Sequence, residues 1–101
     1  MTKEFEIGVN LLKKVKGELE ELMQVQDRLT ARKIVSSIIN PITACAYQIR
    51  VGDGPHKEDL LEHLMKLVKE MRDLSDIKSM QETIGKVLEV LKELEEATKE
   101  A

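Results

Sequence analysis

Two histidines and a carboxylate fall at a spacing that could serve a metal ion. His56, Asp59 and His63 occupy positions i, i+3 and i+7, so a helix would place all three on one face. Imidazole and carboxylate groups are common ligands of zinc and other divalent ions. The histidines, however, lie two turns apart, about 10 Å along the axis, too far for one ion without ligands from another chain. We therefore expect no metal site and no cofactor.

His63 also begins an H-x-x-K pattern that ends at Lys66. On a helix, this fragment resembles the sequence around the phosphorylated histidine of histidine-phosphotransfer bundles, which would make His63 a phosphoryl acceptor. Those bundles place a small residue after the lysine so that a response regulator can approach. In this sequence the residue after the lysine is Leu67, which we predict to lie in the core. The alternative interpretation is a solvated histidine beside the apolar seam.

Cys45 is the only cysteine, so the chain cannot form an intrachain disulfide. A thiolate would be a nucleophile, but no histidine is close in sequence, and the flanking residues Ala44 and Ala46 favour a buried, inert thiol. The same apolar stretch carries four polar residues, which either satisfy backbone groups near a proline or line a small pocket. These are Ser36, Ser37, Asn40 and Thr43.

A long stretch of the chain carries basic residues and no acid. Between Arg28 and Gly52 there is no Asp or Glu, although the whole chain has a formal net charge of -3. Such a stretch is either a buried helix with a basic rim or a docking strip for an acidic partner or for phosphate. The net negative charge and the shortage of aromatic residues disfavour nucleic-acid binding. The candidate interaction residues are Arg28, Arg32, Lys33, Ile34, Ile38 and Ile42.

The elements that must position these residues are helices, because apolar residues recur at every third or fourth position. This spacing predicts a long first helix over about residues 3–39. Pro41 lacks a backbone N–H and Asn40 is a good N-cap, so we expect a kink or break at Asn40-Pro41 with a new helix over 41–51. The apolar stripe stays in phase there, which leaves a continuous kinked helix as the alternative.

Turn and capping residues predict the helix boundaries in the second half of the chain. The segment Gly52-Asp53-Gly54-Pro55 predicts a turn, with Asp53 or Gly54 as the cap of a helix over 55–74. Ser79-Met80-Gln81-Glu82 has the form of a capping box and predicts a last helix over 79–99. The expected fold is therefore all-α, an antiparallel bundle of three to four helices in one domain over residues 1–101.

The expected helices differ in length. A helix over 3–39 would span about 55 Å, whereas the last two would span about 30 Å each. The long apolar stripe would then be only partly covered within one chain. A second copy would complete the burial, so we expect a homodimer built on the first helix and the segment 34–49.

A long first helix, a short loop and two shorter helices resemble in layout the all-helical chorismate mutases, which are intertwined dimers. The resemblance implies a dianionic substrate held by arginines and a lysine, for which the chain offers only a loose basic set. That set is Lys14, Arg28, Arg32 and Lys33.

The function that requires no particular motif is that of a non-enzymatic interaction or scaffolding subunit. Such a subunit would self-associate and present charged helix faces to a partner protein. A small all-α enzyme or phosphotransfer domain and a weak nucleic-acid binder through 28–52 are the alternatives. The N-terminus does not resemble a signal peptide, and the apolar segment 34–49 is too short and too polar to span a bilayer. We therefore expect a cytoplasmic protein without a membrane segment.

Overall fold

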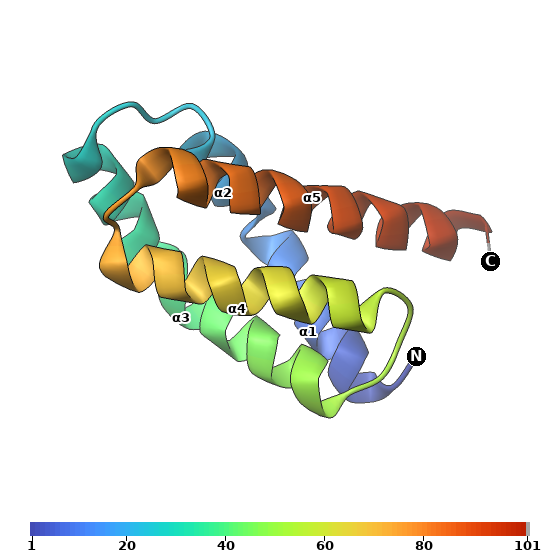
Figure 1. Cartoon of the computed structure of the whole chain (residues 1–101). Coiled ribbons are helices and arrows are strands. Elements are labelled where there is room, and N and C mark those ends of the chain that lie inside the picture. Colours follow the sequence, from blue (N-terminus) through green and yellow to red (C-terminus); the bar gives the residue numbers. More distant parts are fainter. Residues whose placement is uncertain (101) are drawn as a thin grey trace.

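The computed structural model describes residues 1–100, with side chains described through residue 97, and its regular structure is entirely helical. Helices α1 and α2 form one interrupted rod, and each later helix runs back along the one before it (Figure 1). The all-α prediction is confirmed, but the described residues form five helices rather than three to four. These are α1 (Lys3–Lys14), α2 (Lys16–Leu22), α3 (Arg28–Val51), α4 (Lys57–Asp73) and α5 (Ile77–Glu100).

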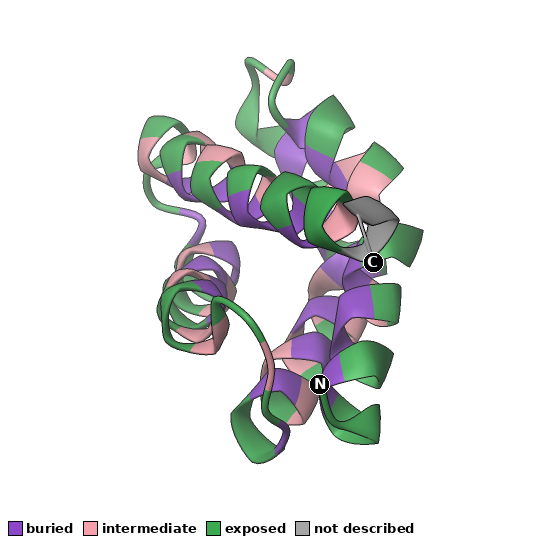
Figure 2. Cartoon of the chain, turned by 90° about the vertical axis from the view of Figure 1, so that its right-hand side faces the viewer, coloured by how far each residue is buried: buried purple, intermediate pink, exposed green. Residues whose placement is uncertain are grey.

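One continuous core lies between the helices, and each helix contributes its buried side to it (Figure 2). Helices α4 and α5, with the residue that ends α4, each bury one seam of apolar residues spaced three or four positions apart. These positions are Leu60, Leu64, Leu67, Met71 and Leu74, followed by Met80, Ile84, Val87, Leu91 and Leu94.

The predicted helix over 3–39 is wrong, because the chain turns back between α2 and α3. Asp27 caps the start of α3, since its Oδ2 accepts hydrogen bonds from the N–H and the hydroxyl of Thr30, both at 2.9 Å. These hydrogen bonds also lower the pKa of Asp27. Leu29 is in phase with the earlier apolar stripe, yet it is 67% exposed. A cap and a polar turn therefore outweigh the apparent continuity of the stripe.

Gln81 of α5 caps the C-terminal end of α2 through its side chain. Its Nε2 donates to the carbonyl oxygens of Leu22 and Val25, each at 2.9 Å. These carbonyls belong to a helix end and the turn after it, where backbone acceptors have no partner within the helix. One side chain thus holds the α2–α3 turn against α5.

We expect Gln81→Ala to lower the free energy of unfolding by about 1–2 kcal/mol, because it leaves two partly buried carbonyls without this donor. Urea denaturation would measure the loss. The matched control is Gln24→Ala in the same turn, where the side chain is exposed and the expected change is below about 0.5 kcal/mol. Equal losses from the two variants would contradict the capping role.

Helix α3 continues through Pro41, so the predicted new helix over 41–51 is also wrong. Proline leaves the Ser37 carbonyl without its usual N–H donor, a loss that ordinarily bends or ends a helix. Here Ile38 and Ile42, on either side of the interruption, are both buried in the core. Packing on both sides holds the two halves of α3 in one helix.

The glycine-rich turn after α3 is tied to the N-terminus of the chain. The backbone N–H of Thr2 donates to the Asp53 carbonyl at 2.8 Å, and the Asp53 N–H donates back to Thr2 Oγ1 at 2.9 Å. Thr2 Oγ1 also caps α1 by accepting from the N–H of Phe5. Asp53 therefore does not cap the next helix as expected, and α4 begins at Lys57 after His56, which takes a left-handed φ of 61°.

Helix α5, in contrast, begins earlier than predicted, at Ile77. The carboxylate of Asp76 accepts from the N–H of Ser79 at 3.1 Å, so Asp76 rather than Ser79 occupies the capping position. The Ser79 hydroxyl instead bonds to the carboxylate of Glu70 on α4. This contact joins the two helices beside the turn that connects them.

The length mismatch that predicted a homodimer is absent. Helices α3 and α5 have 24 residues each and α4 has 17, while the rod of α1 and α2 contributes 12 and 7. Each rod packs along its neighbours within one chain (Figure 1). Among the described residues, no helix combines the length and apolar character that crossing a bilayer requires.

Candidate interaction groove

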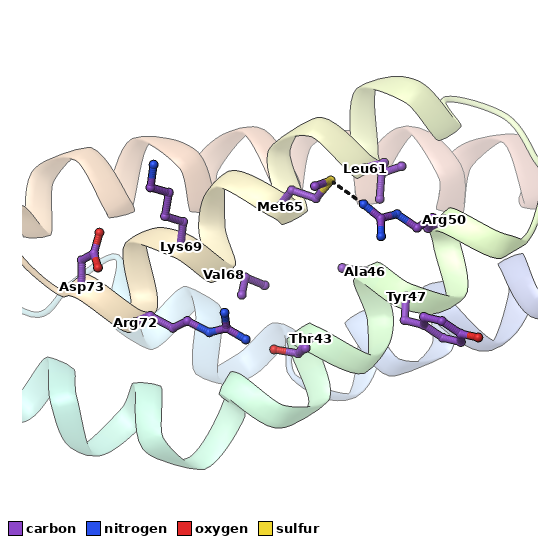
Figure 3. A pocket seen from close by; sticks show the side chains of 10 residues that line it. All are labelled: Thr43, Ala46, Tyr47, Arg50, Leu61, Met65, Val68, Lys69, Arg72 and Asp73. Atoms are coloured by element: carbon purple, nitrogen blue, oxygen red, sulfur yellow. Dashed lines mark hydrogen bonds between the residues drawn. The ribbon is translucent and has the colours of Figure 1, made fainter.

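The outer side of the α3–α4 hairpin holds a groove of about 620 Å³, which we call the α3–α4 groove (Figure 3). Both helices pack their main apolar stripes inward, and the residues that flank those stripes meet over the hairpin. The groove is open to solvent along its length. Its lining residues are Thr43, Ala46, Tyr47, Arg50, Leu61, Met65, Val68, Lys69, Arg72 and Asp73.

The floor of the groove is apolar and half-buried. Leu61 and Val68 of α4 and Ala46 of α3 pack against the edge of the core without being covered. Ala46 is the smallest of the three, so the wall of α3 leaves room at this level. Beside the floor, Tyr47 is 61% exposed and Met65 is 48% exposed. Large apolar groups thus face water next to a hollow that could receive more.

The rim of the groove is basic. Arg50 of α3 reaches toward α4, where its Nη2 lies 3.9 Å from the Met65 sulfur, and Arg72 of α4 points toward Thr43 of α3 (Figure 3). Lys69 lies at the outer edge of α4 and points away from α3. Asp73 is the only acid in the lining. Among the described residues, neither arginine takes part in an ion pair.

A second, smaller hollow of about 250 Å³ continues the surface toward the start of α3. It shares Arg72 with the α3–α4 groove and adds Arg32, Ser36 and Ile39. Arg32 and Arg50 therefore mark two ends of one surface, with Arg72 between them. Helix α3 contributes no acid to it.

The six candidate interaction residues do not form one surface. Arg28, Arg32 and Lys33 are exposed and Ile34 is half-buried, whereas Ile38 and Ile42 lie in the core of the same chain at 2% and 0% exposure. Those two isoleucines are covered within the chain and are not accessible to another molecule. Of the six, Arg32 alone borders one of the hollows on the α3–α4 hairpin.

The two histidines pair with different acids. His63 Nε2 lies 3.5 Å from an oxygen of Asp59, one turn away on α4, and His56 Nδ1 lies 3.5 Å from Glu93 of α5. No group of three metal-ligating side chains forms among the described residues. Lys66 is exposed on α4, and neither His63 nor Lys66 lines the α3–α4 groove.

Cys45 lies in the core, where its Sγ donates to the carbonyl oxygen of Gly8 at 3.1 Å. Burial raises the pKa of the thiol to about 12, which keeps it protonated near neutral pH. Gly8 allows this contact because a Cβ there would lie 2.7 Å from Ile49. The pair thus marks a close approach of α1 and α3.

The hydroxyl groups near Pro41 bond to their own helix. Ser36 donates to the Arg32 carbonyl, Ser37 to that of Ile34 and Thr43 to that of Ile39. Two of these residues also border a hollow, since Ser36 lines the smaller one and Thr43 lines the groove. None of these hydrogen bonds reaches the Ser37 carbonyl that Pro41 leaves without a donor, so only the interpretation that polar residues line a hollow has support, at Ser36 and Thr43.

Sequence reasoning missed most of the groove. Tyr47 and Arg50 lie three residues apart on α3, and Met65, Lys69 and Arg72 follow at helical spacing on α4. A large apolar residue beside a cation on two successive helices was the available signal. This pattern indicates a groove only once α3 and α4 are known to pack side by side, which brings the two sets of residues together.

No protein-family model, curated protein or solved structure matches the chain.

Proposed function

We propose that this protein is a non-enzymatic interaction module that binds a segment of a partner protein in the α3–α4 groove. The observation that carries the proposal is the combination of an apolar floor, two exposed large apolar side chains and a cationic rim. Apolar hollows with exposed anchors are the usual receptors for side chains of a partner. Unpaired cations at the edge favour encounter with an acidic surface.

The two residues that the sequence singled out as a nucleophile and a phosphoryl acceptor lie outside the groove, which favours binding over those two chemistries. Cys45 is buried in the core, and His63 does not line the groove. Within the lining, the hydroxyl of Thr43 donates to its own helix. Arg50 and Arg72 enter the groove at different points along its length, which suits an extended ligand better than a compact substrate (Figure 3).

A different protein is a better occupant than a second copy of the chain. If two copies docked groove to groove, Arg50, Lys69 and Arg72 of each would face the same cations of the other. Such like-charge contacts oppose a symmetric interface. The expected homodimer also loses its main support, because the first helix is not longer than the rest of the bundle.

Site-specific photo-crosslinking would test the proposal. A photoreactive amino acid at Tyr47 is expected to capture a discrete partner from an extract of the source cells. The same group at Lys14, exposed on α1, is the matched control and should capture none. Ala46→Arg, which fills the floor, should abolish the adduct while circular dichroism shows an unchanged fold. Equal capture from both positions, or no effect of Ala46→Arg, would refute the proposed function.

A further inference from the structure

We infer that the occupant of the α3–α4 groove is an acidic amphipathic helix with two carboxylates seven residues apart and apolar residues between them. This inference rests on the proposed function and specifies the chemistry of the partner. The spacing of the cations, the apolar floor and the nature of the walls each point to one part of that description.

The spacing of the cations sets the spacing of the carboxylates. Arg50 reaches Met65 at 3.9 Å, so the cationic head from α3 lies level with position 65 of α4. Arg72 is attached to α4 seven residues further along, about 10 Å along the helix axis, and its side chain extends toward Thr43 of α3 (Figure 3). Two carboxylates on one face of a partner helix, at i and i+7, are separated by the same distance.

The floor sets the residues between the carboxylates. Leu61, Val68 and Ala46 lie half-buried beneath the rim, with Met65 exposed in the middle. In a helix that lies in a groove, apolar side chains at i+3 and i+4 project from the same face as i and i+7. The matching partner pattern is therefore E-x-x-Φ-Φ-x-x-E, where Φ is a large apolar residue.

The walls favour a helix over an extended strand. Both walls are helices, whose backbone donors and acceptors are bonded internally, so a strand would find no edge with which to pair. The surface from Arg32 to Arg50 runs about 27 Å along α3, enough for a helix of about 18 residues. Helix α3 has no acid along this length.

Four synthetic peptides would test the inference. Each is a capped helical host of about 18 residues with Leu at i+3 and i+4. The first carries Glu at i and i+7, the second Gln at both positions and the third Lys at both. The fourth keeps the two Glu residues but moves them to the opposite face, so that its net charge equals that of the first.

Binding would be followed by the amide NMR signals of Ala46, Leu61 and Val68 and by fluorescence anisotropy. At low salt the Glu peptide should bind at least about five-fold more tightly than the Gln and back-face peptides, and the advantage should shrink as salt is added. The Lys peptide should bind most weakly.

The double variant Arg50→Glu/Arg72→Glu should reverse the order, so that the Lys peptide binds best. Lys86→Glu/Lys92→Glu on α5 makes the same change in net charge away from the groove and should leave the order unchanged. A loss of fold would not produce such a reversal, because it would weaken all four peptides.

Equal binding of the Glu and Gln peptides would overturn the inference and leave the groove as a docking site of another specificity. Failure of all four peptides to shift the groove signals would also overturn it. Tighter binding of duplex DNA or anionic vesicles to these amides would replace the acidic helix with another polyanion. The proposed function fails separately, through the crosslinking result at Tyr47.

Discussion

Gly52→Ala is expected to lower the free energy of unfolding by about 3 kcal/mol. A Cβ at this position would lie 2.5 Å from the backbone nitrogen of Phe5 and 2.8 Å from Thr2 Oγ1. Neither atom belongs to the end of a long, flexible side chain, so the clash must separate the N-terminus from the turn. Separation breaks the paired hydrogen bonds between Thr2 and Asp53. Urea denaturation followed by circular dichroism would measure the loss.

Gly17→Ala provides the matched control. Gly17 lies in α2, and nothing surrounds the position where its Cβ would stand. Alanine favours helices over glycine, so this variant should be between neutral and about 1 kcal/mol more stable. A Gly52→Ala protein as stable as the Gly17→Ala protein would show that the N-terminal contact contributes nothing.

The second large effect is a loss of stability in alkali caused by Cys45. Its pKa is raised from 9.0 to about 12 by burial, so the folded protein keeps a proton that the unfolded chain releases. The contribution of the buried thiol is fully present below pH 9.0 and is lost as the pH rises toward about 12. Three pKa units correspond to about 4 kcal/mol.

The comparison that isolates this effect is wild type against Cys45→Ala. The two proteins differ at this one residue, so the contributions of all other ionisable groups cancel in the difference. Denaturation at several values between pH 8 and pH 12, about the range that spans both pKa values, should show the wild-type advantage shrinking or reversing. Parallel curves would mean that Cys45 titrates alike in the folded and unfolded states.

The sequence was sufficient to predict which faces of the helices are buried. The seam from Leu60 to Leu74 and the seam from Met80 to Leu94 both lie in the core, because a repeat of three and four residues leaves a helix one apolar face. It was less informative about where helices end. The turn before Asp27 escaped notice because the apolar spacing runs through it, and the break at Pro41 was overestimated because packing holds α3 together.

The groove could not be predicted in the same way, because it depends on the flanks of two helices and not on their buried faces. In the sequence, Ala46, Met65 and Val68 stand beside apolar positions, and spacing alone does not separate them from the buried stripes. Only the close pairing of α3 with α4 makes them the floor and edge of one hollow. The acid-free stretch from Arg28 to Gly52 did identify the helix that supplies one of its two central arginines.

The contact of Gln81 with the end of α2 also constrains the order in which the protein can assemble. Its partner Leu22 lies 59 positions earlier in the chain, whereas the hairpins of α1 with α3 and of α3 with α4 join nearer neighbours in sequence. During synthesis those hairpins can pair while the last helix is still inside the ribosome. The α2–α3 turn acquires its donor only after residue 81 emerges, so the turn lacks this contact while the earlier helices pair.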